Sequence, residues 1–141
     1  MGPNVMETVA KSLENIRSSA DFVSASGALA DEWIKAGLGD EAIPSIISFI
    51  EYNPDIDFGE PGPLVHFAER FDESTYEPVL RASIRRTPTF HTLWMLNRIM
   101  NVAETAEENA DRVALLNEVL AMPGLDQDLR SWVEDFLDMH T

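Results

Sequence analysis

The sequence predicts an all-α fold of seven or eight helices in antiparallel pairs, built either as a short HEAT-like α-solenoid or as an irregular helical bundle. Apolar residues recur at helical spacing along almost the whole chain, and no stretch alternates convincingly between apolar and polar residues as a half-buried strand does. Gly and Pro fall between these apolar stripes, where they end helices and form turns. The length of 141 residues is typical of one domain, so a single all-helical domain is expected over residues 1–141.

Four helices are predicted in the first half of the chain. Gly37 and Gly39 close the second of them, Asp40 opens the third, and Asn53-Pro54 ends it. A Gly/Pro-rich loop then leads into a short fourth helix. The four apolar stripes lie within residues 5–16, 29–38, 40–52 and 64–71.

Four more helices are predicted in the second half. Ser74 and Glu77 have the spacing of a capping box for the fifth helix, and Thr87-Pro88 or Thr89 begins the sixth. The fifth and sixth helices can be laid over the seventh and eighth with a shift of 36 residues, which places Leu80 on Leu116 and Leu96 on Trp132. Helix hairpins at such a period are typical of HEAT and TPR arrays. The apolar stripes lie within residues 79–84, 93–100, 113–120 and 129–137.

The composition narrows the classes of partner. A formal net charge of −15 repels phosphate backbones, so neither DNA nor RNA is expected as a ligand, whereas a basic protein would be attracted. The absence of cysteine excludes disulfides and Cys-ligated zinc. No apolar run approaches the roughly 20 residues that span a bilayer, and residues 1–6 show no secretory signal. A cytoplasmic protein without membrane contact is therefore expected.

The segment "IDFGEPGPLVHF", residues 56–67, contains the triplet Asp57-Phe58-Gly59, which also occurs at the metal site of protein kinases. A kinase further needs a Gly-rich loop, a strand lysine and a catalytic loop, and the chain has none of these. Gly59 and Gly62 instead suit a stiff corner between two helices. Such a loop would display the carboxylates of Asp55, Asp57 and Glu60 for binding.

No catalytic or metal-binding constellation is found. His66 and Glu69 are spaced i,i+3 as some metal ligands are, but no second pair matches them, so we expect a half-buried, hydrogen-bonded His66 and no metal. No phosphate-binding loop, dinucleotide fingerprint or nucleophile elbow occurs. The chain is therefore expected to be neither an enzyme nor a cofactor-binding protein.

The segment "RASIRRTPTFHTLWMLNRIMN", residues 81–101, sets Asn97 and Arg98 among Leu, Trp and Met, and residues 78–103 hold four Arg and no acid. A guanidinium near apolar surface needs partners. We therefore expect Arg98 to pair with carboxylates from residues 51–69. The alternative is a basic notch that receives an acidic group of a ligand.

Two segments carry a resemblance to a known family: "PSIISFIEYNPDIDFGEPGPLVHFAERF" (44–71) and "YEPVLRASIRRTPTFHTLWMLNRIMN" (76–101). They resemble small all-helical bacterial immunity proteins that are encoded beside polymorphic toxins of contact-dependent or type VI systems. The resemblance implies a protein that binds and neutralises a cognate toxin, with a nuclease as one candidate. The alternative is a HEAT-like adaptor that binds a peptide or another protein.

Two surfaces are candidates for the partner. Carboxylates that mimic phosphates would meet a basic toxin first, and the competing surface is a basic one on the concave face. The acidic candidates are Asp55, Asp57, Glu60, Asp72 and Glu73, and the basic candidates are Arg85 and Arg86.

Overall fold

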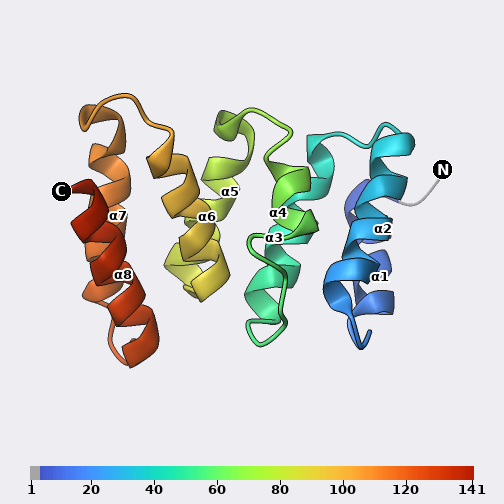
Figure 1. Cartoon of the computed structure of the whole chain (residues 1–141), viewed down its shortest axis with the longest axis horizontal. Coiled ribbons are helices and arrows are strands. Elements are labelled where there is room, and N and C mark those ends of the chain that lie inside the picture. Colours follow the sequence, from blue (N-terminus) through green and yellow to red (C-terminus); the bar gives the residue numbers. More distant parts are fainter. Residues whose placement is uncertain (1–3) are drawn as a thin grey trace. The chain divides into compact units, whose positions relative to one another are not determined.

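A computed structural model describes residues 4–141, and its regular structure is entirely helical (Figure 1). Two short 3₁₀ segments, Asp40–Ala42 and Glu107–Asn109, lead into the third and seventh helices. The predicted all-α class is thus confirmed, and no strand occurs among the described residues. The α-helices are α1 (Val5–Ile16), α2 (Phe22–Lys35), α3 (Ile43–Tyr52), α4 (Pro63–Ala68), α5 (Glu73–Arg86), α6 (Phe90–Asn101), α7 (Ala110–Leu120) and α8 (Gln127–His140).

Residue contacts divide the chain into two compact units, residues 1–79 and 80–141, with the boundary inside α5. In the first unit, α1 packs on both α2 and α3, and α2 packs on α4. α1 and α3 therefore stack on one another, and α2 and α4 do the same. Helical-repeat arrays show stacking of this kind. The expectation of one domain over the whole chain stays a prediction.

The core of the first unit combines buried aliphatic side chains with contacting aromatic rings. Phe22 of α2 and Phe49 of α3 stack with ring centroids 5.7 Å apart, and Phe58 meets both rings edge-on at 5.5 and 6.2 Å. Phe58 belongs to the loop between α3 and α4, so the core anchors the middle of that loop. The largest fully buried aliphatic residues of this unit are Leu13, Ile43, Ile46, Ile47, Ile50 and Leu64.

The predicted corner between two helices is confirmed at residues 53–62, and Gly59 and Gly62 both have positive φ. Phe58 is only 2% exposed, and Gly62 has φ 96° and ψ 171°. Glycine alone adopts this backbone region readily. A Cβ on Gly62 would stand 1.5 Å from the carbonyl oxygen of Phe58, so the chain closes tightly there. The loop is thus held by a buried ring and by a close approach of its own backbone.

Three local predictions for residues 21–74 were wrong. α2 begins at Phe22 and not near Leu29. Asp21 caps this start by accepting a hydrogen bond from the Ser24 amide. The first turns of the helix carry mainly small residues, so they show no apolar stripe. Ser74 is not an N-cap, since α5 begins at Glu73 and the Ser74 hydroxyl donates to Asp72.

The third error concerns His66, whose side chain is 63% exposed rather than half-buried, although it does pair with Glu69 (Nδ1 to Oε1, 3.5 Å). The buried residues of the short helix α4 are Leu64, Val65, Phe67 and Ala68.

In the second unit, α8 packs on both α6 and α7. Thr89 caps α6 in a capping box with Thr92, which selects the later of the two predicted start points. Leu80 and Leu116 are both buried, as the 36-residue shift predicts, but Trp132 is 42% exposed whereas its counterpart Leu96 is fully buried. The internal repeat therefore holds only in part.

Arg98 is half-buried on α6, and its pairing with carboxylates of residues 51–69 stays a prediction. Within residues 4–141 no helix combines the length and the apolar character that crossing a bilayer requires.

Candidate protein-interaction surface

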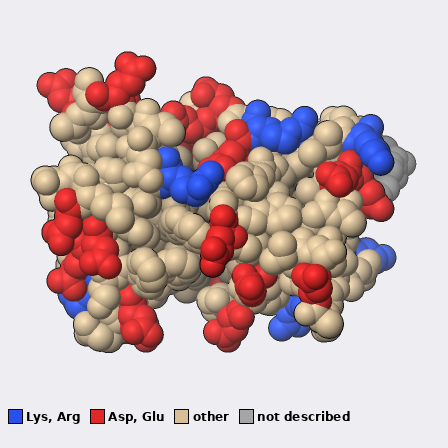
Figure 2. Space-filling view, in the orientation of Figure 1, with Lys and Arg blue, Asp and Glu red and all other residues tan. Residues whose placement is uncertain are grey.

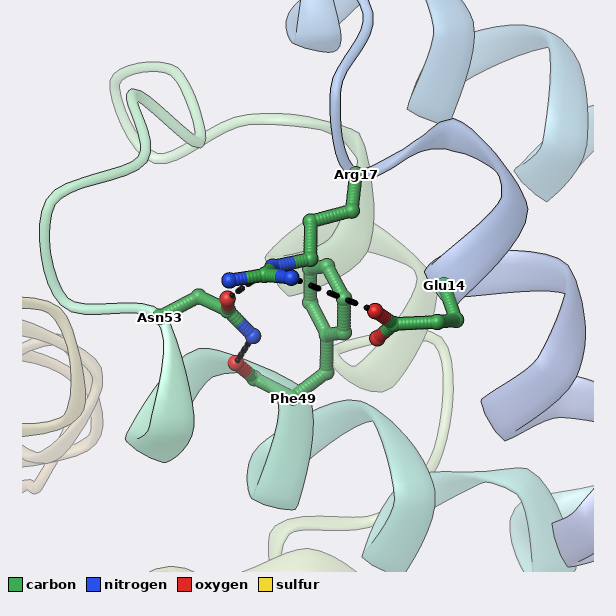
Figure 3. Close-up of polar contacts among 4 residues, drawn as sticks. All are labelled: Glu14, Arg17, Phe49 and Asn53. Atoms are coloured by element: carbon green, nitrogen blue, oxygen red, sulfur yellow. Dashed lines mark hydrogen bonds and ion pairs between the residues drawn. The ribbon is translucent and has the colours of Figure 1, made fainter.

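The helices α1 and α3 end side by side, and their C-cap residues are joined. Asn53, the C-cap of α3, donates from its side-chain amide to the Phe49 carbonyl oxygen at 2.8 Å (Figure 3). Its Oδ1 accepts from Nε of Arg17, the C-cap of α1, also at 2.8 Å. Arg17 additionally pairs with Glu14 at 3.3 Å. Asn53 thereby satisfies a helix-end carbonyl and tethers the neighbouring helix end.

Two surface hollows meet at this junction. One, of about 350 Å³, lies along α1 and α3 and includes Met6, Glu14 and Phe49 in its lining. The other, of about 360 Å³, is lined by Arg17, Asp55 and neighbouring residues. Both hollows are also lined by Tyr52 and Asn53. We call the surface formed by Arg17, Tyr52, Asn53 and Asp55 the α3 corner.

Tyr52 is the most exposed large apolar side chain of the described residues, with 75% of its surface open to solvent. It is the last residue of α3, and the Asn53 contacts hold the backbone on which it stands. A partner that covers the ring would remove roughly 100 Å² from water, which is worth about 2.5 kcal/mol. Tyr and Arg are frequent hot-spot residues in protein interfaces.

The three acids predicted on the loop do not share one hollow. Asp55 lines the α3 corner, whereas Glu60 lines a third hollow of about 650 Å³ between α2 and α4. Asp57 accepts a hydrogen bond from the Gly59 amide at 2.9 Å and so also stabilises its own turn. All three carboxylates are exposed, so each remains accessible to a basic partner.

The remaining predicted residues differ in their accessibility. Asp72 is exposed and accepts a hydrogen bond from Ser74, while Glu73 is half-buried with one carboxylate oxygen shielded from solvent. Arg85 and Arg86 are exposed and belong to the second unit, where Arg85 pairs with Glu118 at 3.2 Å. Arg85 is therefore partly neutralised already, which makes it a weaker site for an acidic ligand.

The third hollow mixes charges of both signs. Its lining includes Asp31, His66 and Arg70, and the Arg70 guanidinium lies over the Phe67 ring at 5.9 Å from the centroid. Among residues 4–141 no group of three or more His, Asp or Glu side chains is arranged to hold a metal ion. What these hollows offer is recognition through hydrogen bonds, charge and apolar contact.

Sequence reasoning missed Arg17, Tyr52 and Asn53. Arg17 and Asn53 are 36 residues apart, so their contact depends on how α1 packs on α3. A signal for Tyr52 was nevertheless present: an aromatic residue ends an Ile-rich helix directly before Asn53-Pro54, off the buried stripe that includes Ile46 and Ile50.

No family model, no curated protein and no solved structure matches the chain.

Proposed function

We propose that the chain is a protein-binding module that neutralises a basic bacterial toxin in the cytoplasm, in the manner of an immunity protein. The observation that carries the proposal is the α3 corner, where the exposed Tyr52 ring stands on a braced helix end beside Asp55. An aromatic anchor with polar neighbours is the usual composition of an interface hot spot.

Charge supports a basic partner. The chain carries 25 acidic and 10 basic residues, and Figure 2 shows acidic side chains spread widely over the visible face. A toxin that cuts nucleic acid presents a basic active site to phosphates, and carboxylates meet that site as phosphate mimics. Long-range electrostatic attraction would speed the association of the toxin with this protein. The hollows beside Tyr52 would then determine the position and orientation in which the toxin docks.

In this proposal the corner has three roles. Tyr52 supplies the apolar contact, and Asp55 pairs with a toxin Arg or Lys at the rim. Arg17, with 54% of its side chain exposed, donates from Nε to Asn53 and from Nη1 to Glu14, so its remaining guanidinium N–H groups can donate to a partner. Neutralisation then follows from steric occlusion of the toxin's active site, with no bond made or broken.

The test is protection of growing cells from a toxin encoded beside this gene. Wild-type protein should restore growth, and Tyr52→Ala should weaken toxin binding by about ten-fold or more. The triple variant Asp55→Asn, Asp57→Asn and Glu60→Gln should slow association and flatten its salt dependence. Unchanged protection and unchanged association for both variants would exclude the α3 corner as the binding surface.

A matched control separates local charge from overall charge. The variant Glu32→Gln, Glu104→Gln and Glu107→Gln changes the net charge equally at exposed acids elsewhere. It should leave most of the association rate intact. If it slows association as much as the loop variant does, the loop has no special role.

A second candidate function is a HEAT-like adaptor. It is favoured by the stacking of α1 on α3 and of α2 on α4, and by the 650 Å³ hollow between α2 and α4, since helical arrays bind peptides along such grooves. Peptide binding that Arg70→Ala abolishes, without any protection from a toxin, would favour this function over immunity.

A further inference from the structure

The second unit exposes a cluster of aromatic rings where α6 packs on α8. Phe90 lies 4.6 Å from Trp132 and 5.5 Å from Trp94 between ring centroids, and Trp132 lies 6.0 Å from Phe136. Phe136 is buried beneath, Phe90 and Trp94 are half-buried, and Trp132 is 42% exposed. The rings thus run without interruption from the core to the surface.

The exposed part of this cluster continues along α8. Met139 is 63% exposed and follows Trp132 by seven residues, so both lie on one face of the helix. The Met139 sulfur lies 4.0 Å from the side-chain nitrogen of Asn97 on α6, which keeps Met139 at the α6 side of α8. We call the surface formed by Phe90, Trp94, Trp132 and Met139 the aromatic patch. Trp and Met are enriched in surfaces that bind other proteins.

Acids border this patch along α8. Asp128 and Asp135 alternate with Trp132 and Met139 at spacings of four, three and four residues, which place all four side chains on neighbouring positions of the exposed face. Both carboxylates are exposed. The one arginine of α8, Arg130, donates instead to the Leu120 carbonyl oxygen at 3.1 Å. In Figure 2 acidic side chains lie beside an uncharged area over α6 and α8.

We infer that the aromatic patch is a second docking surface, which takes a basic amphipathic segment of a partner protein. Apolar side chains of the segment would cover Trp132 and Met139, and its Lys or Arg residues would pair with Asp128 and Asp135. The same acids would repel an anionic membrane. A second copy of this chain is disfavoured because each copy carries a net charge of −15. This surface belongs to the second unit and is separate from the α3 corner, so either proposal can fail alone.

The experiment uses the full chain and three fluorescein-labelled peptides, with fluorescence anisotropy as the readout. The first peptide carries Leu and Lys at amphipathic helical spacing, the second replaces each Lys by Glu, and the third is a scrambled form of the first. We expect only the first peptide to bind, with an affinity that falls as salt is added. Absence of binding by the first peptide, or equal binding of all three, overturns the proposal.

Two variants locate the binding on the patch. Trp132→Ala should weaken binding of the Leu/Lys peptide about ten-fold. Val102→Ala, which truncates an apolar side chain with 69% exposure at the C-cap of α6, should not weaken it. The pair Asp128→Asn and Asp135→Asn leaves every ring in place and should weaken binding about three- to ten-fold with a flatter salt dependence. The exposed pair Glu104→Gln and Glu107→Gln is its charge-matched control. Equal effects of the two acid pairs would overturn the assignment.

Other occupants of the patch are tested directly. Sedimentation velocity that shows a dimer in wild-type protein and a monomer in Trp132→Ala would assign the patch to self-association. Trp132-dependent binding to phosphatidylglycerol vesicles would assign it to a membrane. Either result overturns the docking of a basic segment.

Discussion

Asn53 in the first unit and Asn109 in the second make the same pair of hydrogen bonds in different surroundings. Each donates its side-chain amide to a carbonyl near a helix end, Asn53 to Phe49 and Asn109 to Met100, at 2.8 and 3.0 Å. Each also accepts from an arginine. Asn109 is buried and its arginine, Arg112, lies three residues along the chain. Asn53 is half-buried, and its arginine comes from another helix.

This difference in burial separates contacts that only stabilise the fold, those of Asn109, from contacts that a binding partner can reach, those of Asn53. A buried amide that loses its partners cannot turn to water, so the Asn109 contacts serve stability. The Asn53 contacts stand beside two hollows and an exposed tyrosine, so they position groups that a partner can reach. Three comparisons, each of a residue in the first unit with a counterpart in the second, test this contrast, and a fourth prediction concerns pH; they run from the largest expected effect to the smallest.

The corner that follows Asn53 should be intolerant of a side chain at Gly62. We expect Gly62→Ala to lower the free energy of unfolding by about 3 kcal/mol or more, because its backbone angles suit only glycine and its Cβ would meet the Phe58 carbonyl. Gly124→Ala is the control in the second unit, with φ 72° and no atom within 4 Å of the new Cβ. That change should cost only about 1 kcal/mol. Equal losses in urea unfolding would mean that the corner is not rigid.

The two asparagines should differ in their contribution to stability. Asn109→Ala is expected to cost about 2 kcal/mol, since it leaves the Met100 carbonyl without its side-chain donor in a buried place. Asn53→Ala should cost about 1 kcal/mol, because water can replace part of what is lost. The measurement is denaturant unfolding of both variants, and a larger loss for Asn53 would reverse the assignment.

Replacing Arg17 should mainly affect binding, whereas replacing Arg112 should mainly affect stability. Arg17→Ala is expected to change stability by no more than about 0.5 kcal/mol, since its pairs are exposed and screened, yet to weaken binding of the toxin. Arg112→Ala should cost about 1 kcal/mol, because it removes a donor from the buried Asn109, and should leave toxin binding unchanged. Unfolding and toxin-binding assays on both variants test this prediction. An Arg17→Ala variant that binds the toxin as tightly as wild type would show that the contacts of Arg17 in the α3 corner are only structural.

The smallest effect concerns pH. Burial lowers the pKa of His140 below its ordinary value of 6.5, so the native state takes up its proton less readily than the unfolded state does. The stability linked to His140 is therefore complete above pH 6.5 and is lost as pH falls from 6.5 through the lowered native pKa. Unfolding measured from about pH 7.5 down to about pH 5.5 should show a steeper loss for wild type than for His140→Gln. Identical slopes would mean that His140 does not titrate differently in the two states.

Helical periodicity and the Gly/Pro signals were sufficient to locate most of the helices and the corner at residues 53–62. These features are local: a helix needs an apolar stripe and end signals, and a tight turn needs glycine. The start of α2 was missed because Phe22–Ala28 is composed mainly of small residues that show no stripe. Its one signal was Asp21, whose side chain caps the helix.

The candidate surfaces depended on tertiary packing. The apolar stripe of α8 predicts that Trp132 is buried, but α6 and α7 cover the face that carries Val133 and Phe136 and leave Trp132 at the margin. In the same way Arg17 and Asn53 meet only because α1 packs on α3. The spacing of apolar residues in the sequence predicts which side of a helix faces the core. Which side chains at the edge of that stripe stay in water is settled by the position and tilt of the neighbouring helices, since those determine how much of the edge is covered.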